Sequence, residues 1–198
     1  MHQFIIAFAI IALSCNLSAR EVTKSEKKFN IDSDPLRYSL GIRNVKGRYK
    51  VSDKSTLGLT FYDYNVKFEE TSDLKVIGNT FGAEYMYFIG GPTFSDSSFI
   101  KAEVGLTKMQ AVGNNEANRN FKFGDIEVSG EAKGVQVFVN YGYNWQWDYF
   151  SLNLYGGVQY YNLSMDAQAT NNSTTLVQDK KTISGSGLDL GVQMGVTF

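Results

Sequence analysis

Apolar and polar residues alternate with a period of two from Leu36 to the end of the chain, which is the rhythm of β-strands rather than helices. The final stretch shows it most clearly. Within 187–198 the even-numbered residues after Gly187 are apolar, and the odd-numbered residues are Gly, Asp, Gln or Thr. Segments that alternate in this way predict strands at 56–68, 76–89, 98–112, 132–146, 150–165 and 184–198. The pattern therefore predicts an all-β chain.

These strands fit a membrane barrel better than a soluble sandwich. A membrane barrel turns apolar side chains outward and keeps a polar interior, and its strands exceed the usual length of about 5–6 residues. Here the polar faces are rich in Gly, Asn, Gln and Thr and poor in Lys. The connections 52–55, 90–97 and 146–149 are short, whereas 113–131 and 165–182 are long and polar. Short periplasmic turns and longer extracellular loops are typical of such barrels.

The segment 36–51 decides the strand count. Its alternation slips phase near Asn44, which indicates a tight turn or a bulge. We expect a hairpin of two short strands here, because an even number of strands places both ends of the chain on the same side. The prediction is an eight-stranded antiparallel transmembrane β-barrel over 36–198.

The amino terminus predicts a targeting segment. The apolar run 4–13 is too short for a membrane-spanning helix, which needs about 20 residues, but it suits a secretory signal peptide. We expect a signal peptide over 1–19 and a charged periplasmic lead-in over 20–35. Two alternatives stay open: a buried amino-terminal helix, and lipidation of Cys15.

Composition argues against an enzyme. The chain has 19 Lys+Arg and 20 Asp+Glu, so its net charge of -1 gives no electrostatic reason to bind nucleic acid. The one His and the one Cys are His2 and Cys15, both inside the predicted signal peptide. General acid–base and nucleophilic catalysis commonly rely on these side chains. We therefore predict a protein without catalytic, cofactor-binding or metal-binding residues.

Charged residues on the polar faces predict a packed interior. They are Arg37, Arg43, Glu84, Lys101, Glu103 and Asp189. Side chains just fill an eight-stranded barrel, and buried charges must pair. We expect Glu84 and Glu103 to face Lys101 together with Arg37 or Arg43. An ion-paired plug is the first interpretation of this set, and a gated or selective conduit is the second.

Aromatic residues gather at the predicted strand ends, as expected where rings meet lipid headgroups. The aromatic girdle beside the short turns consists of Tyr49, Tyr85, Tyr87, Trp145, Trp147, Tyr149 and Phe198, with Phe88, Phe99 and Phe150 close by. A second set near the long loops consists of Phe61, Tyr62, Tyr64, Tyr160 and Tyr161.

Together these features resemble the small outer-membrane barrels of Gram-negative bacteria, of the opacity or attachment-invasion type or of the outer-membrane protein W type. The resemblance covers 36–198 and rests on pattern. Its sharpest element is the strand 191–198, whose Val196 and terminal Phe198 resemble the signal read by the barrel-assembly machinery. Gln193 departs from that signal, which usually has Gly there, and Val196 stands where an aromatic residue is common.

The resemblance implies a location in the outer membrane, with membrane lipid and the assembly machinery as partners. We expect a surface scaffold whose extracellular loops bind a host or cell-surface ligand, with Arg119, Phe121 and Phe123 in one of these loops. The alternative is porin-like or hydrophobic small-molecule transport across the outer membrane.

Overall fold

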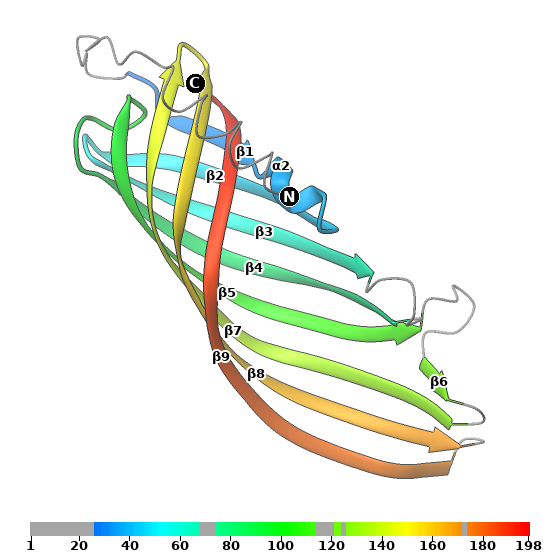
Figure 1. Cartoon of the computed structure of the whole chain (residues 1–198). Helices are drawn as coiled ribbons and strands as arrows, with labels where there is room; N and C mark the ends of the chain where they lie inside the picture. Colours follow the sequence, from blue (N-terminus) through cyan, green and yellow to red (C-terminus); the bar gives the residue numbers. More distant parts are fainter. Residues whose placement is uncertain (1–25, 68–73, 114–120, 124–125, 172–173) are drawn as a thin grey trace.

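The fold is a closed ring of eight antiparallel strands (Figure 1). The computed structural model describes residues 26–67, 74–113, 121–123, 126–171 and 174–198. The strands of the ring are β1 (Phe29–Ser33), β2 (Ile42–Ser52), β3 (Ser55–Lys67), β4 (Leu74–Phe88), β5 (Ser97–Gly113), β7 (Ile126–Trp147), β8 (Phe150–Asn171) and β9 (Thr174–Thr197). Each pairs with the next in this order, and β9 returns to β1. The three-residue β6 (Phe121–Phe123) pairs with the start of β7.

Strand β1 closes the ring although it has five residues. Ile31 stands opposite Gly47 of β2 on one edge and opposite Val196 of β9 on the other. At the end of the chain, Phe29 N donates to Phe198 O at 2.8 Å, and Phe198 N donates to Phe29 O at 2.9 Å. The terminal residue therefore belongs to the hydrogen-bonded seam.

The expected hairpin within 36–51 is wrong. That segment supplies one strand, β2, and the additional strand is β1, which lies inside 20–35, the expected lead-in. Between them the helix α2 (Pro35–Tyr38) begins after Asp34, whose side chain accepts hydrogen bonds from Leu36 N and Arg37 N. The chain then reverses at Gly41, where φ is +76° and a Cβ atom would lie 2.2 Å from Asn65 O. The phase slip in the sequence therefore marks this helix and turn.

The ring has two unlike ends. The connections 53–54, 89–96 and 148–149, together with the start of β1 and the end of β9, lie at one end, here called the short-turn end. Strand length grows around the ring, from 11 residues in β2 to 24 in β9. Strands β7, β8 and β9 consequently run past β2 and β3 at the other end, here called the long end (Figure 1).

Side chains alternate as predicted over most of the ring, with apolar residues outside and polar residues inside. On β4, Phe81, Tyr85 and Tyr87 are exposed, whereas Thr80 and Glu84 are buried. On β9, Leu188 and Leu190 are 79% and 71% exposed. Such a continuous apolar outer surface is unusual for a soluble monomer. We call this surface the outer apolar belt.

The predicted long loop 165–182 is wrong for its described residues. Strand β8 continues to Asn171 and β9 begins at Thr174, so this segment is mostly a paired hairpin. The sequence concealed it because polar residues occupy both faces here, and period-two alternation of apolar residues therefore fades. Part of the expected loop 113–131 is also strand, because β7 begins at Ile126.

Candidate functional site: the filled interior and the long end

An apolar cluster fills the interior at the short-turn end. Its members are Met86, Phe88, Phe94, Phe99 and Tyr155, all buried. Phe94 lies on the β4–β5 connection, which folds across this end and is tied there by a hydrogen bond from Thr93 N to Asp53 O at 2.7 Å. The rings of Phe88 and Phe94 meet edge to face with centroids 6.3 Å apart. This end of the interior is therefore packed with side chains.

A charged network occupies the next layer of the interior. It consists of Asp32, Lys46, Arg48, Glu84, Lys101 and Glu103, each at most 3% exposed. Lys46 Nζ lies 3.1 Å from Glu84 Oε2 and 2.6 Å from Glu103 Oε2, and Arg48 pairs with Asp32 and Glu84. Three cations thus face three anions.

Polar side chains provide further hydrogen bonds to the charged groups of this network. Thr60 Oγ1 donates to Glu103 Oε1 at 2.9 Å, and Arg48 Nη2 donates to Gln193 Oε1, also at 2.9 Å. A buried ion pair is stable only when its remaining donors and acceptors are satisfied. The charged network and these two side chains meet most of that requirement from six different strands, which ties the wall together across the interior.

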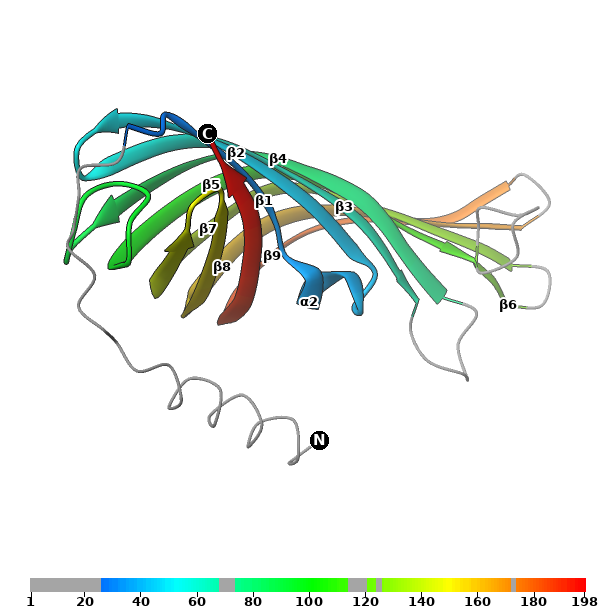
Figure 2. The same ribbon diagram turned by 90° about the horizontal axis from the view of Figure 1, so that it is seen from above.

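The helix α2 lies between β9 and β2 (Figure 2). Its Arg37 side chain reaches Asp189, which is buried in the interior. Arg37 pairs with Asp189 of β9 and with Asp34, whose Oδ2 lies 3.5 Å from Nε. Its guanidinium group lies 5.3 Å from the ring centroid of Tyr62 and 5.9 Å from that of Phe138. The helix therefore acts as a strap whose inner contact is an ion pair held between aromatic rings.

The expected interior residues are brought together with one exception. Glu84, Lys101, Glu103, Asp189 and Arg37 lie inside, and Lys101 Nζ is 3.8 Å from Glu84 Oε2. The exception is Arg43, which is exposed on the outer side of β2. Arg37 also pairs with aspartates rather than with the expected glutamates.

Residues Lys46, Arg48, Asp32 and Asp34 were missed. The alternation of Val45, Tyr49 and Val51 would have placed positions 46 and 48 inside, but the supposed turn at Asn44 interrupted that inference. Asp32 and Asp34 lay within the supposed lead-in.

The residues of the predicted aromatic girdle lie on the outer surface at the short-turn end. Tyr49, Tyr85, Tyr87, Trp147, Tyr149 and Phe198 are exposed, and Trp145 is half-buried. Phe29 adds to the set, since its ring centroid is 5.0 Å from that of Tyr49 and 6.0 Å from that of Phe198. Five other aromatic residues grouped with the strand ends instead face the interior: the buried Phe88, Phe99, Tyr62 and Tyr64, and the half-buried Tyr161.

At the long end the polarity of the wall is reversed. On β8 the exposed outer positions change from Val158 and Tyr160 to Asn162 and Ser164, while Leu163 takes the inner side. The neighbouring strands change in the same way. The inner apolar face so formed consists of Val66, Val76, Met109, Ala111, Ala132, Tyr161, Leu163, Met165 and Ile183, which are half-buried except for the exposed Ile183.

Sequence comparison identifies one family. The model of DUF3575, described as a protein of unknown function, matches residues 5–197. The chain belongs to the DUF3575 family. Neither a curated protein nor a solved structure matches the sequence of this DUF3575 chain. No helix in its described residues is long and apolar enough to cross a membrane.

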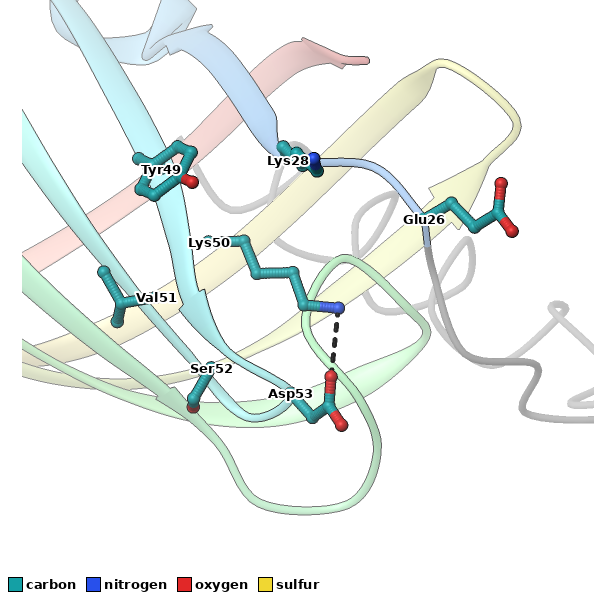
Figure 3. Close-up of a pocket in the computed structure, with 7 residues that line it drawn as sticks. All are labelled: Glu26, Lys28, Tyr49, Lys50, Val51, Ser52 and Asp53. Carbon is teal, nitrogen blue, oxygen red and sulfur yellow. Dashed lines mark ion pairs between the residues drawn. The ribbon is translucent and has the colours of Figure 1, made fainter.

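The DUF3575 chain also has a recess of about 680 Å³ at the short-turn end (Figure 3). Its lining comes from Glu26 and Lys28 before β1 and from the end of β2. Lys50 Nζ lies 3.3 Å from Asp53 Oδ1, and in Figure 3 Tyr49 points away from this ion pair. The recess therefore contains the Lys50–Asp53 ion pair, while the Tyr49 ring lies away from that pair.

Proposed function

We propose that this protein is an integral outer-membrane β-barrel without enzymatic activity, and that it serves as a closed scaffold presenting a binding surface outside the cell. In this proposal the short-turn end faces the periplasm and the long end faces the exterior, as in known barrels. The outer apolar belt supports membrane insertion, because lipid is the solvent in which exposed Leu, Val and Phe side chains are stable.

The reversed polarity at the long end carries the proposal. A strand that crosses a membrane needs about 9–11 residues, yet β8 has 22. Its apolar outer positions end at Tyr160, and polar outer positions follow from Asn162. A wall that leaves lipid and enters water should change in this way. The parts of β7, β8 and β9 beyond this level then stand outside the membrane, where they can meet a ligand or another cell.

The filled interior supports a scaffold more than an open pore. The apolar cluster and the charged network occupy successive layers, and Arg37 adds a third. Passage of a solute would have to displace buried ion pairs, which costs several kcal/mol for each ion, about 3–5 when one partner is removed.

The inner apolar face favours a second candidate function, the binding and transport of hydrophobic small molecules. Tyr161, Leu163 and Met165 could contact an apolar solute at the exterior mouth of the ring. Planar-bilayer conductance and uptake of a fluorescent fatty acid into vesicles test this candidate. A barrel that shows no conductance and takes up no fatty acid would count against transport.

Trimming the long end tests the scaffold directly. Joining Met165 to Lys181 through a two-residue turn removes the outer β8–β9 hairpin but keeps the pairs Met165–Lys181 and Ser164–Thr182. We expect folding to persist, seen as a shift in gel mobility on boiling. Adhesion of expressing cells to cultured host cells and to matrix-coated surfaces should fall to the level of cells without the protein. Unchanged adhesion would refute the binding function, and recovery of the untrimmed protein in the soluble fraction would refute membrane insertion.

A further inference from the structure

The outer wall carries a small cleft where the outer apolar belt ends. Its volume is about 340 Å³, and it is lined by Leu106, Thr107 and Lys108 of β5 and by Lys133, Gly134 and Val135 of β7. These residues form three consecutive opposed pairs: Leu106 with Val135, Thr107 with Gly134, and Lys108 with Lys133. The edge toward the short-turn end is therefore apolar, and the edge toward the long end is cationic.

The two lysines form an unusual cross-strand pair. Like charges directly opposite on neighbouring strands repel and destabilise the sheet. Lys108 and Lys133 are both 61% exposed, and they share Glu131 Oε1 at 3.0 and 2.9 Å. Two cations around one carboxylate leave a net charge of +1. The pair therefore still favours a further anion.

A second pair of the same kind lies on the adjoining strands. Lys67 of β3 stands opposite Lys75 of β4, and both occupy outward positions beyond the belt. Four lysines thus mark the outer wall of β3, β4, β5 and β7 on the long-end side of the apolar residues. An anionic layer just beyond the outer apolar belt is the environment that such a wall fits.

We propose that this cleft binds a phosphorylated, multiply acylated glycolipid of the outer leaflet. Lys108 and Lys133 would bind a phosphate group, for which lysine is a suitable point charge. Leu106 and Val135 would contact the first methylenes of an acyl chain. A ligand that contacts both the lysines and the apolar edge is distinguished from free phosphate, which would contact only the lysines. The inference rests on the proposed membrane insertion.

Binding of a diphosphorylated, hexa-acylated glucosamine disaccharide to the full-length protein in detergent micelles tests the site. We expect the double variant Lys108→Gln/Lys133→Gln to bind it at least about tenfold more weakly, since each lysine near an anionic surface contributes roughly fivefold. Lys180→Gln is the matched control, because Lys180 is also exposed and pairs with Asp166 at 3.4 Å. It should bind as the wild type does.

Two further variants separate the ligand site from a structural ion cluster. Glu131→Gln should tighten binding several-fold by releasing both lysines, whereas a purely structural carboxylate would leave affinity unchanged. Leu106→Asn should weaken the glycolipid but not inorganic phosphate. Equal binding of a dephosphorylated glycolipid, or equal binding by the double lysine variant, would overturn the proposal. All binding is measured on protein that shifts on boiling, so that failure of this site is distinguishable from failure of membrane insertion.

Discussion

Between Phe150 and Tyr160, strand β8 exposes apolar side chains on the outside of the ring, whereas between Tyr161 and Met165 the apolar side chains are on the inside. The backbone pairing is continuous through both regions, with β7 on one edge and β9 on the other. The two regions therefore share one geometry and differ in which face carries the apolar side chains.

Because the backbone pairing is the same in both regions, strand geometry does not explain the reversal, whereas a change from lipid to water under the proposed membrane insertion does. In the first region the interior is a layer of polar and charged side chains, and the exterior must be apolar if it faces lipid. In the second region the exterior is polar, as for a wall in water. The level of Tyr160 and Tyr161 is thus the proposed upper surface of the membrane, and four predictions probe the two sides of it.

The largest effect is expected from the charged network. Glu84→Ala leaves Lys46, Arg48 and Lys101 with too few anions, and we expect the free energy of unfolding to fall by about 3–5 kcal/mol. Urea titration of the protein in lipid vesicles, read by gel mobility, measures it. Val104→Ala on the outer face of β5 is the control and should lose less than about 1 kcal/mol. A loss of similar size in both variants would mean that the network is hydrated.

The next effect compares two outward positions on β9. Leu190→Arg places a charge in the outer apolar belt and should cost about 2–4 kcal/mol if that position lies near the membrane midplane. Ser184→Arg, six residues nearer the long end, should have almost no effect because that position faces water. The same urea titration decides it. An equal loss of unfolding free energy in the two variants would contradict a membrane surface between positions 184 and 190.

Arg37 of the strap is half-buried and pairs with Asp189 in the interior, whereas Arg43 of the neighbouring strand β2 is exposed on the outer wall. Arg37→Ala removes the ion pair with Asp189 and leaves that carboxylate without its cation. Because the Arg37 side chain is partly exposed, the free energy of unfolding should fall by about 1.5–3 kcal/mol. Arg43→Ala changes an exposed side chain and should stay within about 0.5 kcal/mol of the wild type. Faster proteolysis near α2 in the first variant alone would support the strap. Matching stabilities would contradict it.

The smallest effect concerns Glu131 outside the proposed membrane. Hydrogen bonds from Lys133 and Lys108 lower the pKa of Glu131 below its ordinary value. A carboxylate with a lowered pKa in the folded state stabilises the fold above its unfolded pKa and loses this contribution as pH falls through the folded value. Carbon-detected NMR titration should show the lowered pKa, and Lys133→Gln should raise it. If the pKa of Glu131 stayed the same in the Lys133→Gln variant, the ion cluster of Glu131, Lys108 and Lys133 would be disproved.

Period-two alternation was sufficient to predict the all-β class and the outward apolar face. It marked six strands, and the count of eight came from the requirement for an even number, with one of the two added strands misplaced. The alternation also placed Glu84, Lys101, Glu103 and Asp189 inside, because parity alone fixes which side a strand residue faces.

Two regions escaped this reasoning for physical reasons. Strand β1 is short and its Asn and Asp residues have low strand propensity, so its sequence resembled a linker. In the outer hairpin of β8 and β9 polar residues occupy both faces, so the alternation of apolar and polar residues that marks a strand fades there. Arg43 was misplaced because α2 and Gly41 shift the phase of the chain before β2 begins.

Single-cysteine labelling along β8 tests the central claim most directly. Val158→Cys and Ser164→Cys both lie on the outer face, on opposite sides of the proposed membrane surface. Spin labels at these positions in lipid nanodiscs are compared by their collisions with oxygen, which partitions into lipid, and with a water-soluble nickel chelate. We expect the label at position 158 to collide mainly with oxygen and the label at position 164 to collide mainly with the nickel chelate. Equal exposure of both labels to nickel would contradict it.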